Sequence, residues 1–232
     1  MVNRITQSVI QLGWLNAILY LMGRLLSRTS HDRCAIYKYY FVAQAIGFAK
    51  LCRGRGKKII VHRYHIFDEL PPAYPRPSEI VRQRYMRGAA SLAAFNDDKL
   101  IGFLWLSFGS YQEDEVRARY SLAEGQAWDF DVWVAPETRV GLTFSRLWDE
   151  ANSFLESRAM RWSCSRISAF NSASIRAHAR MGMIKLGSAT FLRWGNWQWT
   201  CSTLAPYFHI SRYPASFPNF HFNMNRFNQA QS

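Results

Sequence analysis

The sequence has 232 residues, which at about 100–200 residues per domain predicts one folded domain with appendages. Hydrophobic residues make up 49% and charged residues 19%, which is enough apolar surface for a core and excludes a disordered protein. Lysine and arginine outnumber aspartate and glutamate by 29 to 16, a net charge of +13, and no acidic residue follows Glu156. This charge attracts phosphate, whether in a nucleic acid, an anionic membrane or a phosphorylated cofactor.

The N-terminal residues 9–26 are apolar, but Gln11, Asn16 and Arg24 interrupt them. The stretch therefore falls short of the ~20 apolar residues that a membrane span needs, and no small-residue cleavage site of a signal peptide follows it. The spacing instead fits an amphipathic helix. Its predicted apolar face holds Leu15, Ile18, Leu19, Met22, Leu25 and Leu26, and the opposite face holds Asn16, Tyr20, Arg24 and Ser27.

Two interpretations of this helix remain open. It packs on the domain, or it lies on an anionic inner leaflet with Arg4, Arg24 and Arg28 facing the headgroups. The basic run at residues 53–58 would add to that attraction, or it is a solvated loop.

Strands and helices are then predicted along the chain. Strands are expected at 34–43, 58–66, 91–95, 99–108, 127–134, 162–169, 185–193 and 197–203, and helices at 78–88, 141–158 and 172–181. Ser78 is the expected N-cap of the first of these helices, and residues 96–98 form a hairpin turn. Prolines at 71–77 and acidic residues at 113–115 mark loops. This order predicts an α/β (α+β mixed) sheet.

Three segments follow from this pattern. Residues 1–33 carry the N-terminal amphipathic helix, 34–204 form the main domain, and 205–232 are an aromatic and basic tail. The tail has no helical or strand period, which predicts a wrap-around or partly disordered segment. The cysteines Cys34, Cys52, Cys164 and Cys201 are far apart and form no C-x-x-C pair, which is typical of reduced, mostly buried thiols in a cytoplasmic protein. His62 and His65 have no carboxylate at metal-ligand spacing, so no metal is expected.

Two segments carry a resemblance to a known family. Residues 129–143 read DFDVWVAPETRVGLT, and residues 171–183 read NSASIRAHARMGM. They resemble the two signature motifs of the GNAT superfamily of N-acyltransferases, V-x-P followed by Q/R-x-x-G-x-G/A, and N-x-x-[AS]-x-x-x-[YH]-x-x-x-G-[FM]. The second motif matches at Asn171, Ser174, His178, Gly182 and Met183. The resemblance covers roughly residues 58–204 and implies a mostly antiparallel, twisted sheet flanked by helices.

The resemblance also implies a binding site for coenzyme A. A glycine-bearing loop that opens a helix presents backbone N–H groups to an anion, here the pyrophosphate of acetyl-CoA or a longer acyl-CoA. Arg139 and Arg146 would add positive charge for the phospho-ADP end. Thr143 stands where a second small residue is usual, or Leu142 and Phe144 do in a shifted register, so the cradle is expected to be bulky. The implied cofactor-binding residues are Val134, Arg139, Val140, Gly141, Leu142, Thr143, Asn171 and Ser174.

Acyl transfer to an amine needs a base, a group that polarises the thioester carbonyl and an acid for the leaving thiolate. The resemblance implies Asp129 as base, the backbone N–H of Val134 for the carbonyl and His178 as acid. Period-two alternation predicts that Asp131 shares a face with Asp129, where two close carboxylates would raise each other's pKa. In the alternative, one or both carboxylates form salt bridges with arginines. His178 is otherwise a supporting hydrogen-bonder, and Asn171 caps its helix or bonds the pantetheine amide.

The predicted function is an acyl-CoA-dependent N-acyltransferase, in the simplest form an N-acetyltransferase. Its acceptor is expected to be a bulky, membrane-proximal amine such as an amino sugar or glycolipid precursor, because aromatic residues and the N-terminal helix accompany the motifs. A donor on acyl carrier protein is a second possibility, and a homodimer is left open. The competing class is a non-catalytic GNAT-like binding module at a membrane or protein partner, favoured if Phe144 or Trp133 fills the coenzyme tunnel. Nucleic acid is not an expected partner. A cytoplasmic location is expected, with peripheral contact to the inner membrane.

Overall fold

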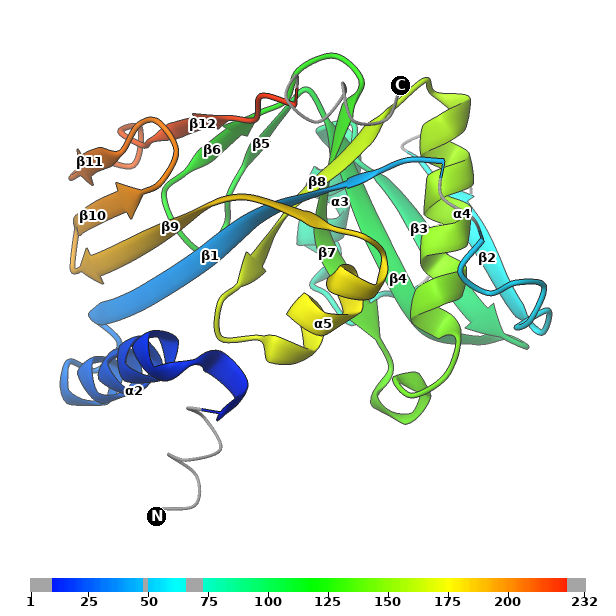
Figure 1. Ribbon diagram of the computed structural model, residues 1–232, viewed down its shortest axis with the longest axis horizontal. Coiled ribbons are helices and arrows are strands. Elements are labelled where there is room, and N and C mark those ends of the chain that lie inside the picture. Colours follow the sequence, from blue (N-terminus) through cyan, green and yellow to red (C-terminus); the bar gives the residue numbers. More distant parts are fainter. Residues whose placement is uncertain (1–9, 48–49, 66–72, 225–232) are drawn as a thin grey trace. The chain divides into compact units, whose positions relative to one another are not determined.

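The computed structural model describes residues 10–47, 50–65 and 73–224 (Figure 1). The expectations for Arg4, for the prolines at 71–72 and for the end of the tail lie outside these residues. The chain divides into two units. Unit 1 comprises Met1–Ala43, Ser110–Ala123 and Arg166–Ser232, and unit 2 comprises Gln44–Gly109 and Glu124–Ser165.

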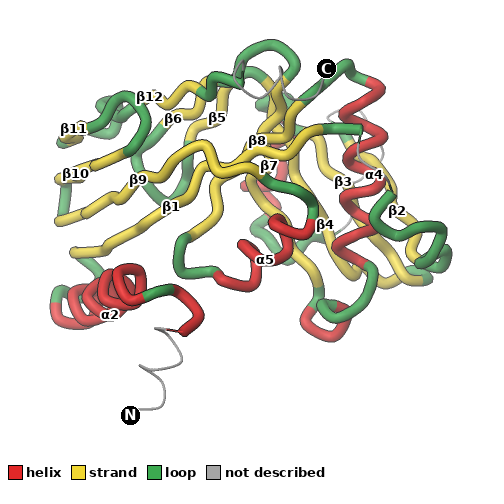
Figure 2. The backbone as a smooth tube through the Cα atoms, in the orientation of Figure 1, coloured by secondary structure: helices red, strands yellow, loops and turns green. Residues whose placement is uncertain are grey.

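Unit 1 is built on long antiparallel strands (Figure 2). Its sheet has the order β11-β10-β9-β1, and a small sheet of order β12-β6-β5 includes one parallel pair, β12 with β6. The strands are β1 (Cys34–Ala45), β5 (Ser110–Gln112), β6 (Arg119–Ser121), β9 (Ile184–Trp194), β10 (Trp197–Ser202), β11 (Phe208–Ser211) and β12 (Asn219–His221). Two helices, α2 (Trp14–Thr29) and α5 (Ser172–Arg180), accompany them.

Aromatic side chains form the core of unit 1. The fully buried ring of Phe41 lies 5.7 Å from Tyr120, 5.0 Å from Phe220 and 5.5 Å from Phe222, measured between ring centroids. The chain after residue 205, predicted as a wrap-around or partly disordered segment, forms two short strands before residue 224: β11 pairs with β10, and β12 pairs with β6. Phe220 of β12 and Phe222 after it bury large apolar rings, a gain that does not require a long periodic pattern.

The acidic segment predicted as a loop is tied into unit 1 by an arginine. The Arg166 guanidinium donates to both carboxylate oxygens of Glu113, at 2.9 and 2.7 Å, and lies 3.0 Å from Glu115. Tyr39 donates its hydroxyl to Glu115 at 2.6 Å, and the Arg166 guanidinium stacks over the Tyr39 ring. Such a paired cluster satisfies charges that would be costly to bury alone.

Unit 2 is a sheet of order β8-β7-β4-β3-β2, antiparallel except for the parallel pair β7 and β8. Its strands are β2 (Ile59–Tyr64), β3 (Ala90–Asn96), β4 (Lys99–Phe108), β7 (Gln126–Val134) and β8 (Trp162–Ser168, which ends in unit 1). Helix α3 (Ser78–Met86) covers one face and α4 (Thr143–Ser157) the other (Figure 1). On the α3 face, Val81 and Tyr85 pack against Phe103 and Trp105.

Most elements predicted from the sequence are confirmed, and so is the mixed, mostly antiparallel fold class. The hairpin turn is confirmed too, with Asp97 at φ 52° between β3 and β4. Ser78 is not an N-cap: Pro77 holds that position, without a side-chain hydrogen bond, and Ser78 is the first helical residue. The short strands β5 and β6 were not predicted, because three residues are too few to show a period.

Candidate active site

The outer half of β7 has a backbone edge beyond its parallel partner. The parallel register joins Gln126–Asp129 of β7 to Trp162–Ser165 of β8, and β7 continues to Val134. On the β4 side, Val134 is opposite Gly102, and the N–H of Ala135 donates to the carbonyl of Ile101 at 2.9 Å. In antiparallel strands this makes Gly102 and Val134 a non-hydrogen-bonded pair. The N–H of Val134 therefore points away from β4, to the edge where a thioester carbonyl could accept it.

A β-bulge separates the two candidate carboxylates. Trp105 of β4 is opposite Asp131, whereas the next residue, Leu106, is opposite Asp129, so Phe130 is an extra residue in β7. Adjacent strand residues point to opposite faces, and directly opposed residues share a face. Asp129 and Asp131 therefore lie on opposite faces, and the prediction that they share one is wrong. Period-two counting fails across the bulge.

Asp131 lies on the α3 face and is paired with two arginines. Its carboxylate accepts from Arg76 Nε at 2.9 Å and Nη2 at 2.8 Å, and from Arg84 Nη1 at 2.7 Å. The Arg84 guanidinium also stacks over the rings of Trp105 and Phe130. This geometry matches the alternative in which an aspartate of this strand forms salt bridges.

Asp129 is buried on the other face of the sheet, with 3% of its surface exposed. Its carboxylate accepts from the Ser163 hydroxyl at 3.1 Å. Cys164, on the same neighbouring strand, has a raised pKa because the thiol is buried and, secondarily, because the Asp129 charge is nearby. Asp129 is thus a buried carboxylate that accepts a hydrogen bond from a neighbouring hydroxyl.

The loop after β7 leads into the start of α4. A 3₁₀ turn at Pro136–Thr138 is followed by Gly141, whose N–H donates to the Thr138 carbonyl at 3.0 Å. Leu142 is the N-cap of α4 and makes no side-chain cap hydrogen bond. Such a start can offer N–H groups to an anion. Val140 is fully exposed in this loop.

Thr143 does not crowd this helix start. Its side chain is buried, and a Cβ added at Gly102 would lie only 2.9 Å from Thr143 Cγ2. Thr143 therefore points into the sheet, toward Gly102. The expectation of a bulky cradle does not hold at this position. Trp133 stacks on Phe103 on the α3 face, with ring centroids 5.5 Å apart, and Phe144 lies 6.3 Å from Trp148.

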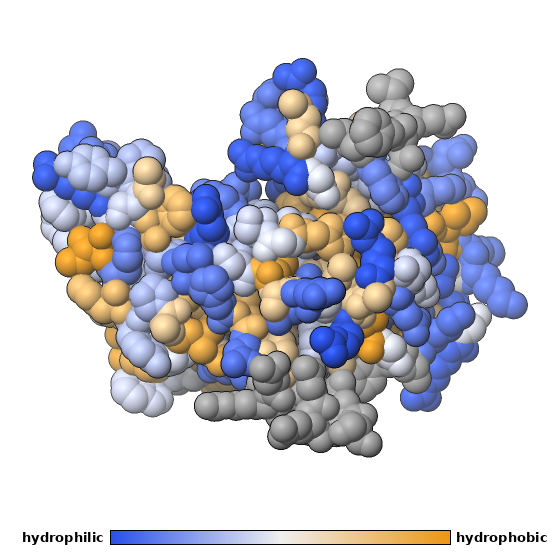
Figure 3. Space-filling view, turned by 90° about the horizontal axis from the view of Figure 1, so that it is seen from above, coloured by the Kyte–Doolittle hydropathy of each residue, from blue (hydrophilic) through white to orange (hydrophobic). Residues whose placement is uncertain are grey.

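The basic run at residues 53–58 is linked to α4 by contacts that no local sequence pattern reveals. Both carboxylate oxygens of Asp149 in α4 accept from this loop's start, from Leu51 N–H at 2.6 Å and Cys52 N–H at 3.1 Å. Gly56, at φ +74°, lies against Arg146 and Leu142 in the first turns of the helix. The loop therefore brings Arg53, Arg55, Lys57 and Lys58 to the N-terminal half of α4. The right-hand side of Figure 3, which corresponds to the α4 and β2 side of Figure 1, shows hydrophilic side chains gathered there.

Arg139 and Arg146, the two arginines predicted to add charge to the cradle, make different contacts. Arg139 is exposed and donates from Nε to the Val134 carbonyl at 3.2 Å, so it folds back over the loop. Arg146 donates to the Ile59 carbonyl at 3.5 Å and lies along Gly56. Arg139 is therefore beside the exposed backbone of β7, whereas Arg146 supports the basic loop.

The second motif forms a connected hydrogen-bonded turn in unit 1. Asn171 caps α5, accepting the N–H of Ser174 at 3.0 Å, as predicted for this residue. His178 is buried, and its Nδ1 lies 2.9 Å from the carbonyl oxygen of Ser174. Because a carbonyl only accepts, the His178 Nδ1 carries a proton. Asn171, Ser174 and His178 thus lie together on α5, whereas the other predicted site residues belong to unit 2.

No protein-family model matches the sequence, and a comparison with curated proteins finds no match. Among solved structures, the chain is similar to a functionally unknown conserved protein from Staphylococcus epidermidis ATCC 12228, with a TM-score of 0.51 and 12% identity over 74% of this chain and 66% of that one. The chain therefore spans just under two thirds of that protein's length. This likeness shows a shared fold.

Two other solved structures, which match with lower TM-scores, are of proteins with a named function or family. An aminoglycoside acetyltransferase from an uncultured soil metagenomic sample matches with a TM-score of 0.40 and 10% identity, over 54% of this chain and 88% of that one. A tandem GNAT protein from the clavulanic acid biosynthesis pathway matches with a TM-score of 0.41 and 14% identity, over 76% of this chain and 57% of that one. The resemblance of this chain to the GNAT superfamily rests on its two sequence motifs.

Proposed function

We propose that the protein is an acyl-CoA-dependent N-acyltransferase. The observation that carries this proposal is the Val134 N–H, which points away from β4, followed along the chain by the start of α4, where the N-cap makes no side-chain hydrogen bond. A pantetheine chain carries amides, so it can add to a strand edge as a peptide would. The pyrophosphate would then reach the N–H groups of the α4 start.

The transfer itself forms a C–N bond and breaks a C–S bond. The amine nitrogen attacks the thioester carbon while the Val134 N–H donates to the carbonyl oxygen. Asp129 accepts the proton that the attacking amine loses, with the Ser163 hydroxyl holding its carboxylate. His178 gives a proton from Nε2 to the leaving thiolate, while Nδ1 keeps its hydrogen bond to the Ser174 carbonyl. The products are an amide and free coenzyme A.

In this proposal Asp131 anchors α3 rather than accepting a proton, since both Arg76 and Arg84 already bind its carboxylate. Asn171 and Ser174 shape the turn that holds His178. The backbone of the cradle consists of Val140, Gly141, Leu142 and Thr143. The acceptor class we propose is a bulky amine near a membrane, such as an amino sugar of a glycolipid precursor.

The basic loop at residues 53–58 supports a phosphorylated donor. The loop carries four cationic side chains and contacts Leu142 and Arg146 of α4 through Gly56, near where the phospho-ADP end of coenzyme A would extend. The same charges favour a second donor, an acyl group on the acidic acyl carrier protein. If coenzyme A carries the donor, the protein binds the free acyl-CoA. If acyl carrier protein carries it, the protein does not bind free acyl-CoA.

The test is calorimetry of the folded protein with acetyl-CoA and, separately, octanoyl-CoA. We expect micromolar binding of at least one thioester. The acyl group that binds more tightly then identifies the class of donor. Replacing Arg53 and Arg55 with glutamine should weaken binding about tenfold or more, because each charged contact to phosphate contributes about 1 kcal/mol or more. Arg82→Gln, an exposed arginine on α3, is the matched control and should leave the affinity unchanged.

The absence of heat with either thioester, from a folded sample, would contradict the coenzyme A proposal. Acyl carrier protein loaded with the same acyl groups is then titrated to test the second donor.

A further inference from the structure

Helix α2 packs on unit 1 through the side that was predicted to be polar. Asn16 donates to the Tyr40 hydroxyl at 2.8 Å, and the Tyr20 ring lies 5.6 Å from Phe170. Gly23 lies against Ile36, where an added Cβ would be 3.4 Å from the Ile36 Cβ. The interpretation that α2 packs on the domain is thus correct for this side of the helix alone.

The opposite side of α2 is a strip of large apolar side chains open to solvent. Their exposed fractions run from 37% to 68%, and their spacing of three and four residues places them on one face. The members are Trp14, Leu15, Ile18, Leu21, Met22 and Leu25. A contiguous exposed strip of this kind marks an interaction surface, because a helix on a water-facing surface normally turns such residues inward.

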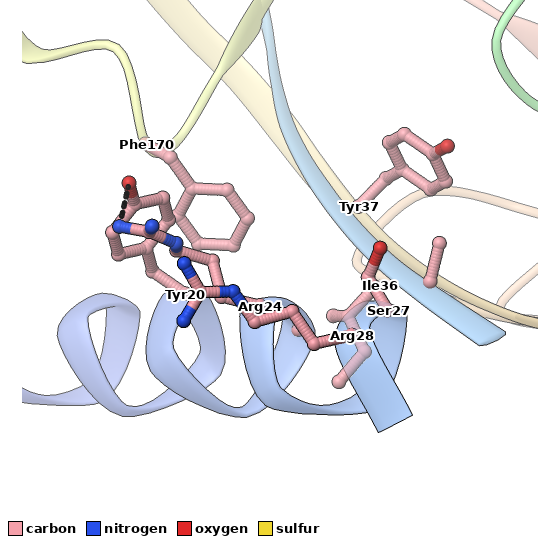
Figure 4. A pocket seen from close by; sticks show the side chains of 9 residues that line it. Tyr20, Arg24, Ser27, Arg28, Ile36, Tyr37 and Phe170 are labelled. Carbon is pink, nitrogen blue, oxygen red and sulfur yellow. Dashed lines mark hydrogen bonds between the residues drawn. The ribbon is translucent and has the colours of Figure 1, made fainter. Parts of the chain in front are cut away.

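Arginines flank this strip. Arg28 follows Leu21 by two helical turns and Arg24 lies between them, so both border one edge of the strip. With Tyr20, Tyr37 and Phe170 they line a pocket of about 370 Å³ between α2 and β1 (Figure 4). Trp14–Thr29 contains no acidic residue. An apolar strip beside two exposed guanidiniums is complementary to acyl chains beneath phosphate headgroups.

Tryptophans lie near both ends of the helix. Trp14 is its first residue, and Trp194 lines a second hollow together with Leu26, Ser30 and Arg33 after the last turn. Indole rings favour the boundary between headgroups and acyl chains because they are apolar but carry one N–H donor. Among the described residues, no helix is long and apolar enough to cross a membrane.

We propose that α2 docks unit 1 onto an anionic lipid surface. The helix lies parallel to the surface, its apolar strip enters the acyl boundary, and Arg24 and Arg28 bind lipid phosphates. A second copy of the chain fits this face less well, because a two-fold contact along α2 would bring the arginines of both copies to a surface that holds no acidic side chain of the helix. This proposal rests on α2 and its neighbours in unit 1 and does not depend on the proposed transferase chemistry.

The test is co-flotation of the full chain with phosphatidylcholine vesicles, with and without about 30 mol% phosphatidylglycerol. We expect binding to the anionic vesicles and at least about tenfold less to the neutral ones. Arg24→Gln and Arg28→Gln should each weaken binding about fivefold. The double variant Ile18→Asp/Leu25→Asp should weaken it by at least about tenfold, because two charges would enter the acyl boundary.

Met86→Asp is the matched control, since Met86 is as exposed as Trp14 but lies on α3 in unit 2. It should bind vesicles like the parent chain, and circular dichroism should show all variants folded. Three results would each overturn the proposal. The first is that the Ile18/Leu25 variant floats with vesicles as well as the parent chain does. The second is that inorganic phosphate, at the headgroup concentration, releases the protein from vesicles. The third is that the parent chain is a dimer in solution and the Ile18/Leu25 variant is a monomer.

Discussion

Asp129 and Asp131 show how one extra residue separates the roles of two identical side chains. Without the bulge at Phe130 both carboxylates would face the same side of the sheet. With it, Asp131 meets Arg76 and Arg84 while Asp129 meets Ser163. Removing one partner of a largely buried ion pair leaves the other charges uncompensated, so the two residues should fail in different ways when replaced.

Asp131→Asn should lower the free energy of unfolding by about 3 kcal/mol, measured by urea denaturation, because two guanidiniums lose their counter-charge. Asp129→Asn should leave coenzyme A binding intact while lowering acyl transfer to an amine at least about hundredfold, measured under saturating thioester. If Asp131→Asn abolishes transfer without loss of stability, the assignment of the two carboxylates is reversed.

At the scale of elements, the position of α4 depends on a residue in the neighbouring strand. A side chain at Gly102 would lie 2.9 Å from Thr143, 3.1 Å from Leu147 and 3.1 Å from the Trp133 carbonyl. The absence of a Cβ therefore lets the first turn of α4 approach the sheet, which fixes the backbone donors of the loop before it. The sequence motif includes no part of β4, so the motif alone does not reveal this requirement.

Gly102→Ala should push the first turn of α4 outward, lowering stability by about 1–3 kcal/mol and weakening coenzyme A binding together with it. Gly23→Ala is the control, because its Cβ would meet Ile36 at an ordinary contact distance in a helix where alanine is favoured over glycine. Thermal denaturation and calorimetry of both variants check this. A Gly102→Ala protein as stable as its parent would show that α4 tolerates the displacement.

The sequence predicts local features of this chain better than its long-range ones. The strand at 127–134, the helix start after it and the Asn171 cap follow from short patterns, and the structure has all three. The bulge at Phe130 was missed because it depends on register with β4. The contact of the basic loop with Asp149 joins residues 98 positions apart, which no local pattern encodes.

Helix α2 is instructive because its sequence period predicts an amphipathic helix but not which of its sides packs on the protein. Periodicity identifies the apolar face of a helix, but not whether protein or another phase covers it. Asn16 and Tyr20 find polar and aromatic partners on unit 1, which lets the polar side pack inward.

At the scale of the whole molecule, the four thiols differ sharply in access. Cys34 in unit 1 and Cys52 and Cys164 in unit 2 are buried, whereas Cys201 is exposed on β10. Burial raises the pKa of Cys34 and Cys164, and burial together with the nearby Asp149 charge raises the pKa of Cys52 to about 11. Since the thiolate is the reactive form, a raised pKa keeps these three thiols neutral and unreactive near neutral pH.

Iodoacetamide at about pH 8 should therefore label one thiol of the native protein, Cys201, and all four after denaturation, as counted by mass spectrometry. Cys201→Ser should leave the native protein unlabelled. As the pH rises toward 11, the Cys52 thiol begins to ionise and the stability that its neutral form contributes is lost, so labelling should spread to it. Rapid labelling of Cys52 or Cys164 at about pH 8 would contradict the burial of these thiols.

The division of the chain also has a consequence for its synthesis. Unit 2 has all its residues once Ser165 has left the ribosome, but unit 1 draws on Arg166–Ser232. The aromatic strand β1 is made before most of unit 2, and its antiparallel neighbour β9 follows only after the whole of unit 2. Until β9 is made, the edge of this aromatic strand that β9 will cover is unpaired and can pair with strands of other chains. β1 is therefore the segment that a chaperone at the ribosome exit would have most reason to shield.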